Sequence, residues 1–119
     1  MAEYWIKTGD TLPRIESTLT DGNDDPFDIA QADVYFTLRP IRAVTPVIEL
    51  AVATNDQIGD GSDGTLGQVH YDWEIGDTDV AGGYYADWRV VFVNNEVMTF
   101  PNNGHDTIAI VDALEASGS

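Results

Sequence analysis

The sequence lacks several features that define common protein classes. It contains no cysteine, which excludes disulfide bonds and thiolate metal sites. No apolar run approaches the roughly 18 residues of a membrane-spanning helix, so we expect none. The N-terminal stretch MAEYWIKTGD has neither the basic start nor the apolar segment of a signal peptide. At 119 residues, with 43% hydrophobic residues, the chain predicts one folded domain.

Basic residues are also scarce. Five Lys and Arg residues stand against 21 Asp and Glu residues, which gives a formal net charge of −16. Such a chain repels phosphates, so we expect it to bind neither nucleic acid nor an anionic membrane directly. Asp (15) outnumbers Glu (6) and there is one lysine, a composition typical of extreme halophiles. In about 1 M salt the Debye length falls to about 3 Å, so repulsion between these charges is screened. An ordinary protein kept soluble by its acidity is the alternative.

What the sequence does contain is alternation of apolar and polar residues with a period of two. Val69, Tyr71 and Trp73 fall on one face of a segment whose other face is polar. After Gly82-Gly83, the same pattern places Tyr84, Ala86, Trp88, Val90 and Phe92 on one face. Large aromatic residues on one side and carboxylates on the other predict a sheet with one buried face.

Similar segments, separated by turn sequences, recur along the chain and predict an all-β fold. We expect strands at residues 11–19, 33–39, 46–53, 68–74, 84–92, 97–100 and 106–111, with a long loop at 55–67. This spacing favours an immunoglobulin-like β-sandwich of about seven short antiparallel strands, with a small barrel as the alternative. We expect Trp73 and Trp88, with Phe36 and Tyr71, to pack at its centre. The predicted organisation is an N-terminal arm at 1–8, the sandwich at 9–112 and a flexible C-terminal tail at 113–119.

The sequence offers no recognisable catalytic, cofactor or metal site, so we do not expect an enzyme. His70 and His105 lack zinc-ligand spacing, and each is interpreted as a surface histidine. No serine occupies a GxSxG elbow, which leaves a Ser-His-Asp hydrolase as a remote alternative. The stretch from Asp60 to Gly64 superficially resembles a calcium loop, but it lacks the alternating acidic pattern and the glutamate at position 12. Turn chemistry is the favoured interpretation.

Exposed aromatic residues are the candidate functional residues. Four of them are predicted to face outward from strands or termini: Tyr4, Trp5, Tyr35 and Tyr85. They fit either an interface with a protein partner, which we favour, or a platform for carbohydrate. If the N-terminal arm adds a strand to a neighbour's sheet, deleting residues 1–7 would impair assembly and leave the isolated domain folded.

The order of the motifs resembles a known family. The matching stretches are KTGDTLPRIESTLTDGNDDPFDIAQADVYFTLRP, GQVHYDWEIGDTDVAGGYYADWRV and TFPNNGHDTIAIV, and they contain two Gly-Asp-Thr triplets, at Gly9-Asp10-Thr11 and Gly76-Asp77-Thr78. Together they are similar to the N-terminal domain of phage baseplate upper proteins (the BppU-like family). Within these triplets, we expect the carboxylates of Asp10 and Asp77 to accept backbone N–H bonds in turns.

The resemblance implies a structural protein of a tailed-virus virion, in the tail or baseplate or associated with the neck or head. Its partners would be other virion structural proteins, with homo-oligomers in a symmetric particle, and no catalysis would be involved. The acidic composition is not part of the family pattern, and it suggests a virus of a halophilic host. A carbohydrate-binding adhesion module on the virion or cell surface is the alternative function.

Overall fold

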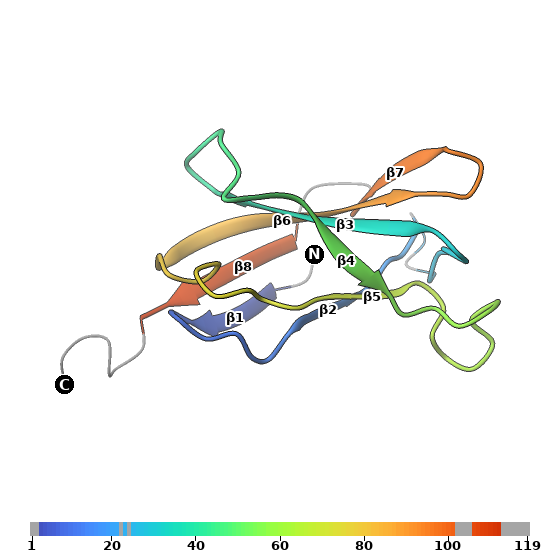
Figure 1. Ribbon diagram of the computed structural model, residues 1–119, viewed down its shortest axis with the longest axis horizontal. Helices are drawn as coiled ribbons and strands as arrows, with labels where there is room; N and C mark the ends of the chain where they lie inside the picture. Colours follow the sequence, from blue (N-terminus) through green and yellow to red (C-terminus); the bar gives the residue numbers. More distant parts are fainter. Residues whose placement is uncertain (1–2, 22, 24, 102–105, 113–119) are drawn as a thin grey trace.

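The fold is seen in a computed structural model, which describes residues 3–21, 23, 25–101 and 106–112. These residues form eight strands and no helix (Figure 1). The strands are β1 (Glu3–Lys7), β2 (Ile15–Thr18), β3 (Asp33–Pro40), β4 (Ile48–Asn55), β5 (Gln68–Tyr71), β6 (Gly82–Val91), β7 (Val97–Phe100) and β8 (Asp106–Val111). The all-β prediction is confirmed. His105 and the predicted C-terminal tail at 113–119 lie outside the described residues.

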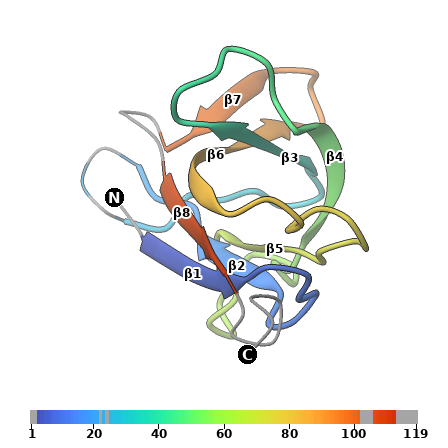
Figure 2. The ribbon, with the colours of Figure 1, turned by 90° about the vertical axis from the view of Figure 1, so that its left-hand side faces the viewer.

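The strands form one mixed sheet that curls until it is nearly closed (Figure 2). Their order is β1-β8-β6-β3-β4-β5-β2, and β7 pairs with β6 beyond the end of β8. The strand β4 makes the corner, because it pairs with β3 along most of its length and then with β5 at Thr54 and Asn55. The first and last strands in this order, β1 and β2, therefore lie on opposite sides of the remaining opening.

The N-terminal segment differs from the predicted arm. Residues Glu3–Lys7 form β1, which pairs in parallel with β8 from Glu3 opposite Thr107 to Lys7 opposite Val111. Ile6 points into the core and is only 4% exposed, whereas Trp5 next to it is 60% exposed. The segment is thus a strand of the domain, and its side chains alternate between the core and the solvent. The expectation of antiparallel pairing is wrong for β1 and β8. The expectation of an unpaired N-terminal arm is wrong for the same reason, whereas the effect of deleting residues 1–7 on folding stays a prediction.

The predicted aromatic centre is confirmed. The ring of Phe36 lies 4.7 Å from that of Tyr71, 5.9 Å from that of Trp73 and 4.8 Å from that of Trp88, measured between centroids. Phe36 and Trp88 are fully buried, and they face each other across the β3–β6 pair. The inward residues of β3 and β6 alternate as the sequence predicts, so this pair forms the wall on which the rest of the domain packs.

The loop at 55–67 is more ordered than its composition suggests. Gln57 organises it, because its side-chain oxygen accepts hydrogen bonds from the backbone N–H groups of Ile29 (2.9 Å) and Gly67 (3.1 Å). Its side-chain nitrogen donates to the Asp28 carboxylate (2.8 Å) and to the backbone carbonyl of Gly59 (3.0 Å). One amide thereby joins both ends of the loop to the chain that precedes β3.

The two Gly-Asp-Thr triplets also differ from each other in their hydrogen bonds. The Asp77 carboxylate accepts the Glu74 N–H (2.8 Å) and the Tyr71 hydroxyl (2.8 Å), which confirms its predicted role in a turn. Asp10 acts instead through its backbone carbonyl, which accepts the hydroxyl of Thr78 at 2.8 Å. No side-chain hydrogen bond of Asp10 occurs among the described residues, so that part of the prediction is wrong.

Candidate functional site

The most developed polar cluster surrounds His70, on the wall formed by β2 and β5. Its Nδ1 lies 2.7 Å from a carboxylate oxygen of Asp56, just after β4. Its Nε2 lies 3.5 Å from Arg14 Nη1 and 3.5 Å from an Asp72 carboxylate oxygen. Only 9% of the His70 side chain is exposed. The prediction of a surface histidine is therefore wrong, because Asp56 and Arg14 cover a ring that the strand period places on the polar face.

This arrangement uses both nitrogens of His70 for structure. A ring with its proton on Nδ1 donates to Asp56 and leaves Nε2 to accept from Arg14. Arg14 also donates to the carboxylate of Glu16 (3.0 Å), which faces His70 across the β2–β5 pair. The cluster thus joins β2, β5 and the end of β4 through charge-assisted hydrogen bonds.

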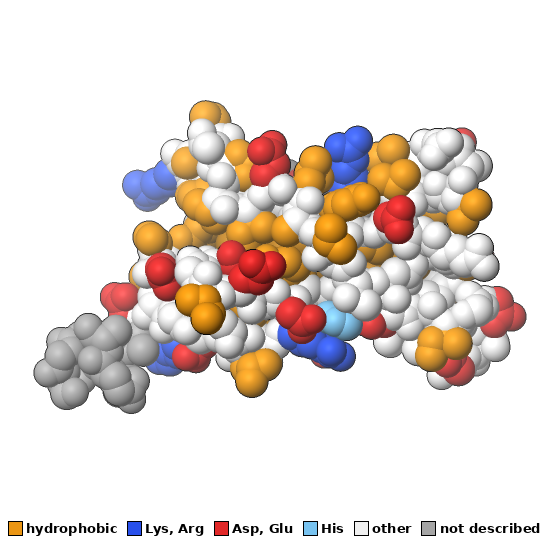
Figure 3. Space-filling view, in the orientation of Figure 1, with side chains coloured by type: hydrophobic (Ala, Val, Ile, Leu, Met, Phe, Trp, Pro, Cys, Tyr) orange, Lys and Arg blue, Asp and Glu red, His pale blue; other side chains and the backbone are white. Residues whose placement is uncertain are grey.

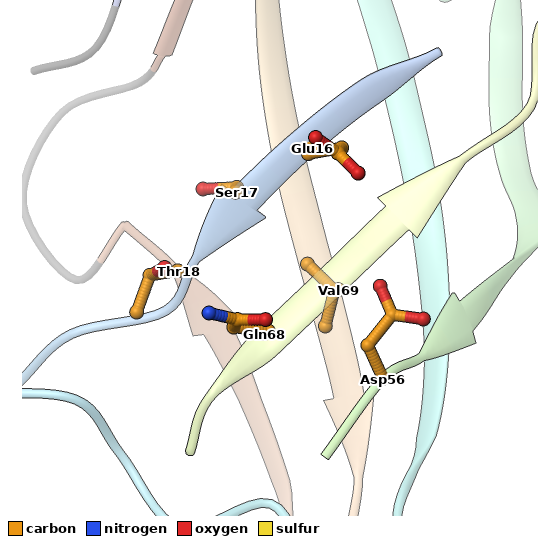
Figure 4. A pocket seen from close by; sticks show the side chains of 6 residues that line it. All are labelled: Glu16, Ser17, Thr18, Asp56, Gln68 and Val69. Carbon is orange, nitrogen blue, oxygen red and sulfur yellow. The ribbon is translucent and has the colours of Figure 1, made fainter. Parts of the chain in front are cut away.

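A hollow of about 270 Å³ adjoins this cluster and is lined by Glu16, Ser17, Thr18, Asp56, Gln68 and Val69 (Figure 4). Ser17 is the serine that lines this hollow, and a hydrolase would need its hydroxyl to align with His70 and Asp56. Figure 4 shows its side chain pointing away from Asp56, and no hydrogen bond joins Ser17 to His70 in the described part of the chain. The geometry therefore provides an Asp–His pair without an aligned nucleophile.

In the loop at 55–67, here called the aspartate-rich loop, two carboxylates accept hydrogen bonds from backbone N–H groups of the loop itself. The Asp60 carboxylate accepts the Ser62 N–H (3.0 Å), and the Asp63 carboxylate accepts the Thr65 N–H (3.2 Å). The hydrogen bond from Ser62 lowers the pKa of Asp60 below its usual value. Within residues 3–21, 23, 25–101 and 106–112, no group of three or more His, Asp or Glu side chains could hold a metal ion. The interpretation of this loop as turn chemistry is confirmed by these bonds.

The four predicted interface residues do not form one surface. Trp5 is exposed on the outside of β1, whereas Tyr4 is half-buried beside Trp73, with ring centroids 6.3 Å apart. Burial raises the pKa of Tyr4, and its hydroxyl donates to the backbone carbonyl of Pro13. Tyr35 and Tyr85 share the outer face of the β3–β6 pair, and each is half-buried.

Sequence reasoning missed a segment with several exposed aliphatic side chains. It is the connection between β3 and β4, here called the 41–47 hairpin, where the exposed fractions of Ile41, Val44 and Val47 are 40%, 91% and 55%. Leu50 and Val52 extend the exposed apolar surface along β4. Figure 3 shows hydrophobic side chains gathered in the upper half of the face where the hairpin and β4 lie. A turn sequence rich in aliphatic residues between Pro40 and Pro46 was the available signal.

Hydrogen bonds hold the 41–47 hairpin in one conformation. The Arg39 guanidinium donates to the backbone carbonyl of Ala43, and it lies 5.4 Å from the ring centroid of Tyr85. The Ile41 N–H donates to Gly83 O (3.0 Å) and the Val47 N–H to Leu38 O (2.8 Å). The exposed aliphatic side chains are thus presented by a fixed loop, which lowers the entropy cost of binding a partner.

The opposite end of the β3–β6 pair carries an apolar hollow of about 470 Å³, here called the phenylalanine hollow. It is lined by Phe27, Asp28, Ala30, Phe92, Val93, Asn94 and Glu96. The Phe27 ring centroid lies 5.8 Å from that of Phe92 and 5.5 Å from that of Phe100, so the wall is anchored in the core. The hydrogen bond from Gln57 lowers the pKa of Asp28, which keeps a negative charge at the rim.

Comparisons of the chain with protein-family models, with curated proteins and with solved structures find no match. The part of the chain that the structure describes contains no helix long and apolar enough to cross a membrane.

Proposed function

We propose that this chain is a non-enzymatic structural component of a tailed-virus virion that acts through protein–protein contacts in a symmetric assembly. The observation that carries the proposal is the fixed 41–47 hairpin, which exposes aliphatic side chains on an otherwise strongly acidic domain. Exposed apolar surface of this kind usually marks an interaction site. The resemblance of the motifs to the baseplate upper protein family supports the virion context.

The topology supports an immunoglobulin-like sandwich as the finer description of the fold. The strands β2 and β5 pair in one layer and β3 and β6 pair in the other, with β1 and β8 extending the second layer. Tyr84, near the start of β6, donates its hydroxyl to the backbone carbonyl of Val80 at 2.6 Å. A tyrosine in this position that bonds back to the preceding corner is a hallmark of immunoglobulin-like domains.

The polar sites support an assembly role rather than a chemical one. His70 is held between Asp56 and Arg14, and the carboxylates of the aspartate-rich loop bond to their own backbone. The net charge of −16 keeps the free domain soluble, and the concentrated salt of a halophilic host screens the repulsion between copies so that they can come into contact. These polar groups thus bond within the fold, while the exposed aliphatic side chains of the 41–47 hairpin are available to partners.

Carbohydrate binding for host adhesion is the second candidate, and the exposure of Trp5 favours it. An aromatic ring that is 60% exposed offers a face on which a sugar can stack. This candidate expects glycan binding that disappears in the Trp5→Ala variant. The structural proposal expects no glycan binding by either protein on an array.

The proposal is tested by separating particles from a lysate of producing cells on a density gradient. We expect this chain to sediment with the particles and to stay with them after washing in concentrated salt. A chain found only at the top of the gradient would overturn the virion assignment.

A further inference from the structure

The 41–47 hairpin and the phenylalanine hollow lie at opposite ends of the same strand pair. In the β3–β6 register, Pro40 faces Tyr84 and Asp33 faces Val91, so the 41–47 hairpin follows one end of the pair and Phe92 follows the other. Figure 1 shows the hairpin at the upper left and the β6–β7 connection at the upper right. One copy therefore presents a protruding apolar loop and a receding apolar hollow, pointing in opposite directions.

The chemistry of the two ends is complementary. The hairpin exposes Val44 and Val47 beside Arg42, one of only five basic residues in the chain. The phenylalanine hollow offers aromatic walls, and its rim carries the carboxylates of Asp28 and Glu96. No ion pair or hydrogen bond of the Arg42 side chain occurs among the described residues, so its charge is available to a neighbour.

We propose that the 41–47 hairpin of one copy of this chain docks in the phenylalanine hollow of the next copy, forming a head-to-tail contact. The inference rests on the proposed assembly function and names the partner as a second copy. Val44 would enter the hollow, and the Arg42 guanidinium would pair with Glu96 and Asp28 at its rim. A hollow of about 470 Å³ has room for more than one aliphatic side chain. Because the two surfaces differ, repetition of the contact builds a ring or a filament rather than a closed dimer.

Salt affects this contact in two opposing ways. Each copy carries a net charge of −16, so long-range repulsion between copies weakens the contact in dilute buffer. The pairing of Arg42 with the rim of the hollow acts instead over a short distance. Raising the salt concentration to about 1 M shortens the Debye length to about 3 Å and removes mostly the long-range repulsion. Association is therefore expected to strengthen with salt.

Complementation between two defective variants provides the decisive experiment. Val44→Glu disables the hairpin, and Val93→Glu disables the rim of the hollow; both side chains are well exposed, at 91% and 69%, so both variants should fold. Ile75→Glu changes a 96% exposed side chain outside both surfaces and serves as the matched control. Folding of each variant is verified by circular dichroism.

Sedimentation velocity of the full chain in about 1 M salt should show concentration-dependent association for the wild type and for Ile75→Glu. Each defective variant alone should stay monomeric. Their mixture should form dimers and nothing larger, because it contains one intact hairpin and one intact hollow per pair. A monomeric wild type at all concentrations, or a mixture that associates no more than its components, would overturn the head-to-tail contact.

A charge exchange tests the pairing at the rim. Arg42→Glu should weaken association about tenfold, and adding Glu96→Arg in the same chain should restore most of it. Loss without restoration would contradict the assigned pairing. A chain that is monomeric in solution but present in purified particles would refute this contact while leaving the proposed virion function intact.

Discussion

The hydroxyl of Thr78 donates a 2.8 Å hydrogen bond to the backbone carbonyl of Asp10, which brings the two Gly-Asp-Thr triplets of the sequence into contact. The Gly9 N–H completes the contact by donating to the Thr78 carbonyl at 3.1 Å. Thr78 is 1% exposed, so water does not compete for these bonds. The contact fastens the turn after β1 to the corner that leads into β6.

Replacing Thr78 with valine tests this contact. The substitution keeps the shape of the side chain and removes the donor, so the unfolding free energy should fall by about 1–2 kcal/mol. Urea denaturation measures the change. Thr99→Val, at an exposed position in β7, is the control and should change stability by less than about 0.5 kcal/mol. Equal effects of the two substitutions would show that the contact contributes nothing specific.

Neighbouring residues in β1 test whether this strand belongs to the folded core. Ile6→Ala should lower the unfolding free energy by about 2–5 kcal/mol, because Ile6 is 4% exposed and its removal leaves a cavity. Trp5→Ala, on the exposed side of the same strand, should cost less than about 1 kcal/mol. Thermal denaturation of both variants measures the difference. If Ile6→Ala is as stable as the wild type, β1 is not an integral strand in solution.

The pair of Asp56 and His70 should contribute to stability. Asp56→Asn replaces a charged acceptor 2.7 Å from the imidazole, and we expect a loss of about 1.5–3 kcal/mol in unfolding free energy. Asp72→Asn is the matched control, since its carboxylate is 3.5 Å from the ring and 70% of its side chain is exposed. A double-mutant cycle with His70→Gln isolates the pairwise energy. A coupling energy near zero would contradict the structural role assigned to this cluster.

Alkaline pH should destabilise the protein. Burial raises the pKa of Tyr71, as does its hydrogen bond to the Asp77 carboxylate, and burial alone raises that of Tyr84. The folded protein then holds these protons more tightly than the unfolded chain, whose tyrosines titrate near 10.0. The stabilisation is complete below pH 10 and is lost as the pH rises above it.

Urea denaturation at a series of pH values measures this dependence. Tyr71→Phe should make the decline of the unfolding free energy above pH 10 less steep, because the variant lacks one of the tyrosines whose pKa is raised by folding. Stability that stays level or rises over this range would contradict the assignment of buried, protonated tyrosines.

Salt distinguishes the halophilic interpretation from that of an ordinary acidic protein. The charge of −16 should make the unfolding free energy rise with KCl up to and beyond about 1 M. A rise that ends at about 0.15 M, where the Debye length is already about 8 Å, would favour the ordinary acidic protein. Measuring the urea midpoint at each salt concentration separates these outcomes.

The elements that the sequence predicted best are those with a strong period and a buried face. Val34, Phe36 and Leu38 of β3, and Tyr84, Ala86 and Trp88 of β6, alternate cleanly and are buried as expected. The strand β1 was missed because its partner is β8, at the other end of the chain, and local composition does not show such a pairing. Long-range pairing therefore limits what sequence patterns can predict.

The candidate site was harder to predict for the same reason. The position of His70 on the polar face of its strand was correct, but its burial depends on Asp56 and Arg14, which come from distant segments. Of the exposed aliphatic residues of the 41–47 hairpin, only Val47 falls within a predicted strand, at 46–53. Ile41 and Val44 lie between two predicted strands, where the sequence pattern does not show whether a side chain is exposed. Exposure is a property of the assembled fold, and in this fold Val44 of the hairpin is more exposed (91%) than Trp5 (60%).

Immunogold labelling of purified particles with an antibody to this chain would locate the protein in the virion. We expect label on the particle, at the tail tip if the chain belongs to the baseplate and over the head or neck if it decorates or connects those parts. Unlabelled particles that also lack the chain by mass spectrometry would contradict a structural role in the virion.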